Sequence, residues 1–429
     1  MSVVTSGSDV MQSTDAKELL RLRVFGSPDQ LARVEPALNT AFAQWHSIWQ
    51  PPSEIDIRYF HSRPELHDHV LLLGQSDLGP NQPPMQVAGC AVDPDAAATS
   101  CVGELVERHL GRAWINPTPK HATAASFAPE DAFPVADYFG APVFPDRWLY
   151  PRFTADRPLT WTQARRYPDG DPIWVPESLV GLGAPAPAER LGEVTTVGLA
   201  AGSSYRQAAA HGLYEMLERA TVMDYWQTHR PFELLTGAAI VDHTDFLATD
   251  KMLGWHTQLL QARSAAGTGV AVALTRHTEI PAFGIGLSAH PDPAERLRHA
   301  LAEAVQVRLL ASLQQGHTTD TLTSFQDHLT YYCHPLRFAD LDTLVGPPTD
   351  EVIEQPIEDD AELAGLLTDA GSRVAAVELA RSAAGGPAVV RVRATRLPHM
   401  EVRESCACLP APALTTAAAP GPYRPHPYP

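Results

Sequence analysis

Three segments of the chain share a plan that could place oxygen ligands side by side. Each begins with a turn of glycine and other small residues and continues into an alanine-rich helix. Two acidic or amide residues stand three positions apart on that helix, and an arginine follows them. The segments are 88–108 (AGCAVDPDAAATSCVGELVER), 198–219 (GLAAGSSYRQAAAHGLYEMLER) and 284–308 (GIGLSAHPDPAERLRHALAEAVQVR). The spacing from Gly198 to Glu215 equals that from Gly286 to Glu303, which indicates internal repetition.

The paired residues could bind a divalent cation. Residues i and i+3 lie on the same face of a helix, so each pair offers neighbouring side-chain oxygens. The pairs are Glu104 with Glu107, Glu215 with Glu218, and Glu303 with Gln306. Like charges on adjacent turns destabilise an isolated helix by about a few tenths of a kcal/mol, so their repetition suggests a compensating cation. Several carboxylates suit Mg²⁺, which commonly bridges to substrate phosphates.

The arginines beside these pairs could hold a phosphate. Arg108 and Arg219 directly follow the acid pairs, and Arg308 lies two residues beyond Gln306. A guanidinium group can pair with an acid or with a phosphate. The alternative is that each segment is a solvated helix surface, although three copies behind glycine turns favour the ligand interpretation. A phosphate-binding P-loop is excluded, because no lysine stands in a G-x-x-x-x-G-K-[ST] pattern.

The composition narrows the classes of partner and compartment. The net charge of −18 argues against nucleic acid or an anionic membrane as the main partner. No apolar run approaches the ~20 residues of a membrane helix, and the first residues lack the pattern of a secretory signal. The five cysteines are too scattered for a disulfide framework, so we expect reduced thiols in a cytoplasmic protein. A zinc half-site at Cys406 and Cys408 is the alternative, but no second pair exists.

The elements that must position these residues predict an α/β (α+β) fold. Residues 1–85 look like a small N-terminal α/β region, with a strand pattern over 18–25 and a helical pattern over 29–49. Residues 86–429 then form one larger domain that contains the three repeated strand/turn–helix units. Two stretches rich in proline resemble linkers, 117–134 and 181–189. The proline- and alanine-rich end, 409–429, can be neither helix nor central strand.

The motifs resemble those of the YcaO family over roughly residues 86–429. The stretch from Ser100 to Arg108 is similar to the first motif, S-x-x-x-E-x-x-E-R. The stretch E-M-L-E-R that begins at Glu215 resembles the second motif, and E-A-V-Q-V-R from Glu303 resembles the third, E-x-x-Q-x-R. The final PHPYP is similar to the P-x-P-x-P terminus of azoline-forming members.

The resemblance implies an ATP-binding fold in which the three helices gather around ATP and Mg²⁺. It assigns metal ligation to Glu104, Glu107, Glu215, Glu218 and Glu303. It assigns the wider cofactor site to these residues together with Ser100, Arg108, Gly202, Arg219, Gln306 and Arg308. Family members phosphorylate the oxygen of a backbone amide, and phosphate with metal-neutralised charge is a good leaving group.

The reaction implied is cyclodehydration of Cys, Ser or Thr residues of a ribosomally made precursor peptide to thiazoline or oxazoline. Other amide chemistry of the family, thioamide or macroamidine formation, is an alternative, as is a non-catalytic accessory subunit. Val197 stands where the second motif carries Asn, so Thr195 or Thr196 must substitute or the enzyme depends on a partner. We expect a separate leader-peptide-binding partner, and a homodimer is possible.

The proline-rich end is predicted to enter the active site. Alternating prolines hold an extended conformation of ~3.1 Å per residue, so the tail has the reach to do so. We expect the terminal carboxylate of Pro429 to act as a base and His426 to carry a proton. A disordered tail is the alternative.

Overall fold

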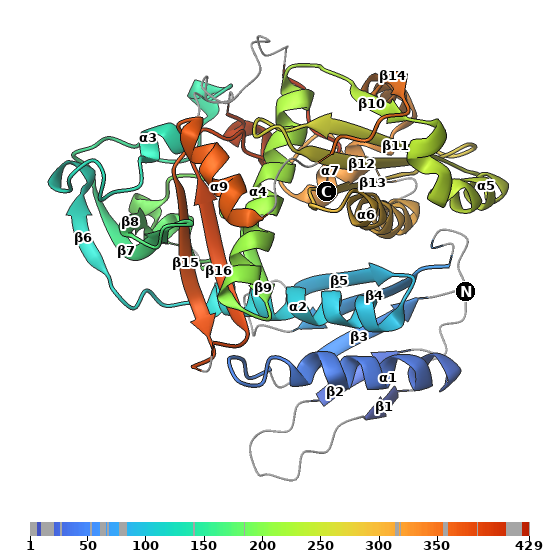
Figure 1. Ribbon diagram of the computed structural model, residues 1–429, viewed down its shortest axis with the longest axis horizontal. Helices are drawn as coiled ribbons and strands as arrows, with labels where there is room; N and C mark the ends of the chain where they lie inside the picture. The colour runs from blue at the N-terminus through green and yellow to red at the C-terminus, as the bar shows by residue number, and fades with distance from the viewer. Residues whose placement is uncertain are drawn as a thin grey trace.

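The computed structural model describes residues 7–9, 21–25, 28–51, 54–60, 66, 68–76, 84–139, 142–183, 185–313, 317, 319–354, 359–383, 385–408 and 423–428. Three β-sheets with packed helices make up this part of the chain (Figure 1). The predicted mixed α/β class is confirmed. None of the helices described here is both long enough and apolar enough to cross a membrane.

The first sheet contains the strands nearest the N-terminus, in the order β1-β2-β3-β4-β5. Helices α1 and α2 share a buried apolar core with it. The elements are β1 (Gly7–Asp9), β2 (Arg21–Phe25), α1 (Pro28–Ala43), β3 (Glu54–Phe60), β4 (Val70–Ser76), β5 (Met85–Ala91) and α2 (Pro94–Ala113). The expected division between residues 85 and 86 falls at the first residue of β5, so a strand of this sheet lies mostly beyond it.

The second sheet has the order β13-β12-β11-β10-β14 and is antiparallel except between β10 and β14. Helix α6 packs on β12 and β13. The elements are β10 (Phe232–Leu235), α5 (Thr244–Met252), β11 (Trp255–Arg263), β12 (Gly269–His277), β13 (Phe283–Ser288), α6 (Pro293–Leu313) and β14 (Val345–Thr349). Leu66, which precedes β4, and Leu71 of β4 pack against Val305 and Leu309 of α6. This apolar contact joins the first sheet to the second.

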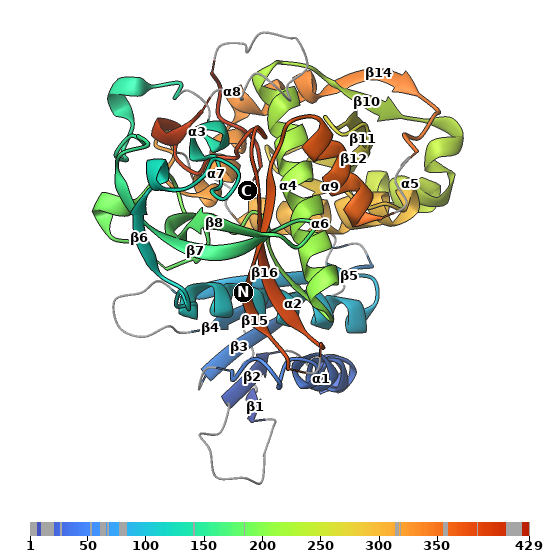
Figure 2. The ribbon, with the colours of Figure 1, turned by 60° about the vertical axis from the view of Figure 1, so that its left-hand side comes forward.

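The third sheet has the order β6-β7-β15-β16-β9, with β8 paired to β7. Helix α4 packs on β9 and β16. Figure 2 shows α4 alongside β16 from a second side. The elements are β6 (Lys120–Thr123), β7 (Pro158–Arg166), β8 (Pro172–Pro176), β9 (Leu199–Gly202), α4 (Tyr205–Gln227), β15 (Val374–Arg381) and β16 (Ala388–Ala394). The remaining helices are α3 (Val135–Tyr138), α7 (Phe325–Tyr332), α8 (Pro335–Phe338) and α9 (Asp360–Asp369). The predicted linker 117–134 was wrong in part, because it contains β6.

Each repeated segment forms a strand, a turn and a helix, as the sequence predicted. The units are β5–α2, β9–α4 and β13–α6, and each strand stands at the end of its own sheet. Glycine lets each helix lie directly on its strand: a Cβ at Gly89 would stand 2.1 Å from Ala97 O, and one at Gly286 would stand 2.0 Å from Ala300 O. Helix α2 also contacts β9, α4 contacts β13, and α6 contacts β5, so the three sheets meet at these terminal strands.

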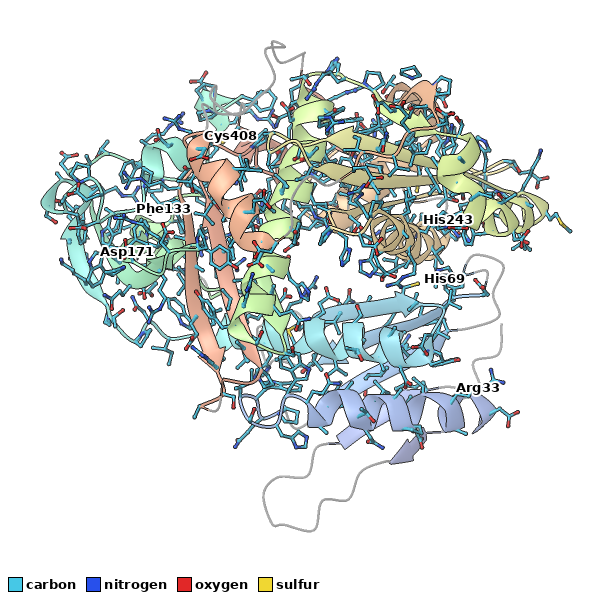
Figure 3. The ribbon with its side chains drawn as sticks, viewed as in Figure 1. Arg33, His69, Phe133, Asp171, His243 and Cys408 are labelled. Carbon is cyan, nitrogen blue, oxygen red and sulfur yellow. The ribbon has the colours of Figure 1, made fainter. Side chains whose placement is uncertain are left out.

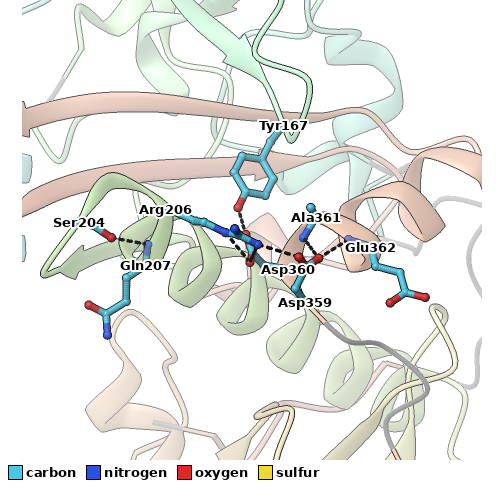
Figure 4. Close-up of polar contacts among 8 residues, drawn as sticks. All are labelled: Tyr167, Ser204, Arg206, Gln207, Asp359, Asp360, Ala361 and Glu362. Atoms are coloured by element: carbon cyan, nitrogen blue, oxygen red, sulfur yellow. Dashed lines mark hydrogen bonds and ion pairs between the residues drawn. The ribbon is translucent and has the colours of Figure 1, made fainter. Parts of the chain in front are cut away.

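Side chains at the contacts between layers hold the units in place. His69 lies on the first sheet's side facing α5, where its ring meets Phe246 edge-on with 6.0 Å between centroids (Figure 3). At the start of α4, Arg206 forms ion pairs with Asp359 at 2.7 Å and with Asp360 at 3.2 Å (Figure 4). Tyr167 donates a hydrogen bond to the same Asp360. These contacts tie α4 to α9 and to the end of β7.

Candidate functional site

The side chain of the first glutamate in each motif is hydrogen-bonded to the backbone of its own strand–helix unit. A backbone N–H of the strand or of the turn before it donates a hydrogen bond to that carboxylate. The bonds run from Ala88 to Glu104 at 2.6 Å, from Gly198 to Glu215 at 2.9 Å, and from Leu287 to Glu303 at 2.6 Å. Sequence separations of 16, 17 and 16 residues show that the three units share one local geometry. The same type of hydrogen bond therefore holds one carboxylate in each of the three units.

A cavity of about 560 Å³ lies between the first and second units, and we call it the first cavity. Five of the predicted site residues line it: Ser100, Glu104, Glu107, Gly202 and Glu215. Gln207 and His211 of α4 complete its polar wall. The structure therefore brings motif one and motif two to the same space, although about a hundred residues of sequence separate them.

A second cavity of about 360 Å³ lies between the first sheet and α6. Glu104, Arg108 and Gln306 line it, so Glu104 borders both cavities. Arg108 Nη2 lies 2.5 Å from Glu104 Oε1, and its Nη1 donates to Gln86 O at 2.6 Å. Motifs one and three therefore meet here, with an ion pair between the cavities.

Arg219 joins motif two to motif three. Its Nε lies 3.3 Å from Glu218 Oε1, and its Nη2 donates to Glu303 Oε1 at 3.2 Å. The other Glu218 oxygen accepts a hydrogen bond from the Ala289 N–H at 3.2 Å. Helix α4 is thus connected through polar contacts to α6 and to the residue that directly follows β13.

The carboxylates of this region repel one another in a buried setting. Burial raises the pKa of Glu107 well above its usual value, and the charges of Glu215 and Glu104 raise it further. Burial also raises the pKa of Glu215, and it raises that of Glu218 to about 8 together with the charge of Glu303. Arg219 opposes both increases. A cation placed among these groups would relieve the repulsion.

The donor chemistry fits Mg²⁺. All the candidate ligands are carboxylate or amide oxygens, which this ion prefers, and it usually takes few protein ligands alongside waters and phosphates. Among the described residues, no three acidic, histidine or cysteine side chains already form a cage for a metal ion. Glu104 pairs instead with Arg108, and Glu218 and Glu303 pair with Arg219. The assignment of five glutamates as ligands stays a prediction.

Arg308 does not join the other predicted residues. Its side chain is fully buried, and Nη1 donates to both carboxylate oxygens of Asp250, at 2.7 and 2.9 Å. The guanidinium also lies over the Trp255 ring, 4.9 Å from its centroid. It lines neither cavity. We expected a phosphate contact, but a fully buried ion pair with Asp250 occupies this arginine instead.

Two buried arginines next to the second motif were not predicted from the sequence. Arg391 and Arg393 of β16 donate hydrogen bonds to backbone carbonyls of the loop that precedes β9. A guanidinium group has only donors, so each arginine needs acceptors of this kind. Their signal was present in the sequence AVVRVRA. Two arginines at alternate positions of an apolar strand share one face and demand acceptors inside the protein.

In the described part of the tail, residues 423–428, the last three residues are buried. His426 Nε2 lies 2.6 Å from Glu401 O, and its ring stacks on His328 with 3.9 Å between centroids. Burial lowers the pKa of His426 well below its usual value, and the charges of His328 and Arg219 act in the same direction. His426 is therefore neutral at pH 7. Pro429, predicted as a base, lies outside the described residues.

Comparison with known families agrees with the motifs. Residues 88–397 match the family described as YcaO cyclodehydratase, ATP- and Mg²⁺-binding. An uncharacterized protein in the tfuA 3′ region of Rhizobium leguminosarum bv. trifolii is 28% identical over 52% of this chain and 54% of its own length. An uncharacterized protein of Mycobacterium tuberculosis is 30% identical over 36% of each chain. The match thus spans about half or less of these relatives.

Solved structures share the fold at low sequence identity. A heterocyclase in complex with substrate and cofactor has a TM-score of 0.69 and 16% identity, covering 87% of this chain and 53% of that one. YcaO from Methanopyrus kandleri bound with AMPPCP and Mg²⁺ has a TM-score of 0.62 and 17% identity, covering 88% and 95%. The E. coli microcin synthetase McbBCD complex has a TM-score of 0.58 and 16% identity, covering 78% and 92%.

Proposed function

Because this chain belongs to the YcaO family, we propose that it catalyses ATP- and Mg²⁺-dependent cyclodehydration of a ribosomally made precursor peptide. A Cys, Ser or Thr side chain of the peptide attacks the carbonyl carbon of the residue before it. The former amide oxygen takes the γ-phosphoryl group of ATP and leaves as phosphate. The side-chain proton and the amide proton are lost, and the products are an azoline ring, ADP and phosphate.

The observation that supports this proposal most strongly is the meeting of three terminal strand–helix units. Their glutamates lie around the first cavity and along the Arg219 ion pairs, as a site for phosphates and Mg²⁺ requires. Glu104, Glu107, Glu215, Glu218 and Glu303 are the proposed Mg²⁺ ligands. When bound there, Mg²⁺ would neutralise phosphate charge.

The remaining cofactor-binding residues can be assigned by their place around the cavities. Arg108 and Arg219 each pair with a carboxylate in this structure. Because a guanidinium group forms the same charge-assisted hydrogen bonds with phosphate, each can exchange its carboxylate partner for a phosphate of the nucleotide. Ser100 and Gly202 line the first cavity, and Gln306 lines the second. Arg308 is left out of the proposal, because its donors serve Asp250.

The peptide and its partner are proposals by comparison with the structural neighbours. One neighbour is a heterocyclase in complex with substrate, and another is the McbBCD complex with pro-MccB17 bound. We propose that this chain also takes a precursor peptide and works with a leader-binding partner. Thioamide or macroamidine formation would use the same ATP site.

A non-catalytic accessory subunit is the second candidate, and Val197 favours it. Its side chain packs against the apolar core formed by α4, α9 and β16 instead of offering a polar group to the site. An enzyme without the amide of the usual Asn could lack turnover while keeping the fold.

One experiment separates these functions. Purified protein is incubated with ATP, Mg²⁺, a candidate precursor peptide and its leader-binding partner, and both phosphate release and peptide mass are followed. Cyclodehydration predicts loss of one water per ring with phosphate release. Exchange of oxygen for sulfur would indicate thioamide formation, and fragmentation separates a macroamidine from an azoline. An unchanged peptide without phosphate release indicates the accessory subunit.

A further inference from the structure

The peptide unit between Val197 and Gly198 is held at both of its polar groups. Its carbonyl, Val197 O, accepts hydrogen bonds from Arg391 Nη1 at 2.9 Å and from Arg393 Nη1 at 2.5 Å. Its N–H, on Gly198, donates to Glu215 Oε2 at 2.9 Å. A single peptide plane therefore connects two guanidinium groups to the first glutamate of motif two.

The two guanidiniums are themselves fixed by buried backbone carbonyls. Arg391 is 0% exposed and Arg393 is 6% exposed. Arg391 also donates to Val180 O at 2.8 Å and to Thr196 O at 2.9 Å, and Arg393 donates to Leu179 O at 2.6 Å. Burying two like charges on one strand face is costly, so a purely structural tie would be served better by neutral groups. The cost of burying both charges therefore favours a role for the positive charge itself.

The backbone around this peptide unit leaves little freedom. Gly198 has a φ of 76°, and a Cβ there would stand 2.5 Å from Val392 O. Gly198 O in turn accepts from the Val392 N–H at 2.6 Å. Since the Val197 side chain packs into the apolar core, residue 197 can reach the site only through its backbone. The position where the family motif carries Asn thus contributes a carbonyl held by two charges.

We infer that Arg391 and Arg393 are positioning residues of the nucleotide and Mg²⁺ site, acting on Glu215 through the Val197–Gly198 peptide. A carbonyl that accepts two charged hydrogen bonds polarises its peptide, which strengthens the N–H as a donor to the carboxylate. The arrangement orients Glu215 toward the first cavity without a polar side chain at residue 197. This inference rests on the proposed function, because its measured effect is on nucleotide binding.

A double-mutant cycle tests the connection. The dissociation constant of AMPPCP in the presence of Mg²⁺ is measured by calorimetry for the wild type, Arg393→Met, Glu215→Gln and the double variant. We expect Arg393→Met to weaken binding about tenfold in the wild-type background. In the Glu215→Gln background the same change should weaken binding by less than about twofold, since the arginine then has no carboxylate to orient.

Two further variants separate positioning from loss of folding. Arg393→Lys keeps the charge but lacks the planar fork of donors that reaches Leu179 O and Val197 O together, so we expect an affinity between those of the wild type and Arg393→Met. Arg373→Met is the matched control, because Arg373 also donates to loop carbonyls, Pro129 O at 2.7 Å and Ala132 O at 3.5 Å, and neither acceptor lines a cavity. It should change affinity by less than about twofold. Circular dichroism and thermal melts confirm that each variant is folded.

The outcomes distinguish this inference from the function on which it rests. Equal affinity of Arg393→Met and wild type, or effects of Arg393→Met and Glu215→Gln that simply add, would overturn the positioning role alone. Failure of the wild type to bind AMPPCP with Mg²⁺ would overturn the proposed function and this inference together. If Arg393→Met does not fold, the same comparison is made with Arg393→Lys, which should weaken binding in the wild-type background only.

Discussion

Arg219 on α4 donates a hydrogen bond of 3.2 Å to Glu303 on α6, across a separation of 84 residues. This contact joins two motifs that stand on the terminal units of different sheets. Because Arg219 also pairs with Glu218, one guanidinium holds two carboxylates that would otherwise repel each other. We expect these ion pairs to exchange for a bound phosphate and cation, and the first prediction depends on that exchange.

Glu218→Gln should reduce peptide-dependent phosphate release at least about 100-fold and leave the fold intact. The amide oxygen of glutamine can still accept from the Ala289 N–H, but it lacks the negative charge that binds a cation. Phosphate release and circular dichroism are measured together.

The matched control for this variant is Glu295→Gln on α6. Glu295 forms a surface ion pair with Arg298, and such pairs contribute little to stability. Activity within about twofold of the wild type is expected. Wild-type phosphate release by Glu218→Gln would show that this carboxylate is not a metal ligand.

Arg308→Met should destabilise the protein by about 3–5 kcal/mol, because it leaves the carboxylate of Asp250 buried without its cation. The double variant Arg308→Met with Asp250→Leu should recover much of this loss, since both buried charges are removed. Urea unfolding measures both. A stable Arg308→Met that binds AMPPCP poorly would instead return Arg308 to the nucleotide site.

The stability of the wild type should fall between pH 5 and pH 8 in part through Glu401. Burial raises the pKa of this carboxyl from 4.5 to about 8, with a smaller contribution from Glu193. The folded protein therefore holds a proton that the unfolded chain releases, and the stabilisation present below pH 4.5 is lost as the pH rises toward 8.

Thermal melts at several pH values test this assignment. Glu401→Gln should lose part of the decline in Tm between pH 5 and 8, and at pH 8 it should melt at least about 2 °C above the wild type. Glu404→Gln is the control, because Glu404 forms a partly exposed pair with Arg147. If Tm depends on pH in the same way in the wild type and in Glu401→Gln, Glu401 does not cause the loss of stability.

Much of the site could be predicted because its geometry is local. The spacing of Glu215 from Gly198, and of Glu303 from the β13 glycines, indicates a helix that packs back on the preceding strand. Each glutamate can then accept a hydrogen bond from the backbone of its own unit. Arg308 could not be placed, because its partner Asp250 lies on α5 and nothing in the motif refers to it. The meeting of three sheets at their terminal strands depends on pairings such as β15 with β7, which join residues about 200 positions apart.

The described residues of the proline-rich tail are bound by helices α7 and α4. Tyr332 Oη donates to Pro425 O at 2.6 Å, and Trp226 Nε1 donates to Arg424 O at 3.0 Å, so side chains of α7 and α4 bind the tail backbone. Appending one glycine after Pro429, or deleting residues 427–429, should abolish ring formation if the terminal carboxylate acts as a base. Tyr332→Phe should weaken ring formation less, by about tenfold, since one hydrogen bond is lost.

Ring formation is followed by peptide mass and AMPPCP affinity by calorimetry for all three tail variants. The glycine extension should retain nucleotide affinity within about threefold, because the carboxylate of Pro429 is predicted to act as a base and not to bind the nucleotide. Full ring formation in both the extended and the shortened protein would leave the tail no catalytic role.

The central claim is that the motifs of α2, α4 and α6 form one nucleotide and Mg²⁺ site. A crystal structure of the protein with AMPPCP and Mg²⁺ tests it most directly. The account predicts metal ions about 2.0–2.1 Å from glutamate oxygens of at least two of these helices, with the phosphates beside them. A nucleotide bound away from Glu104, Glu215 and Glu303, or metal ions without a glutamate ligand from these motifs, would contradict it.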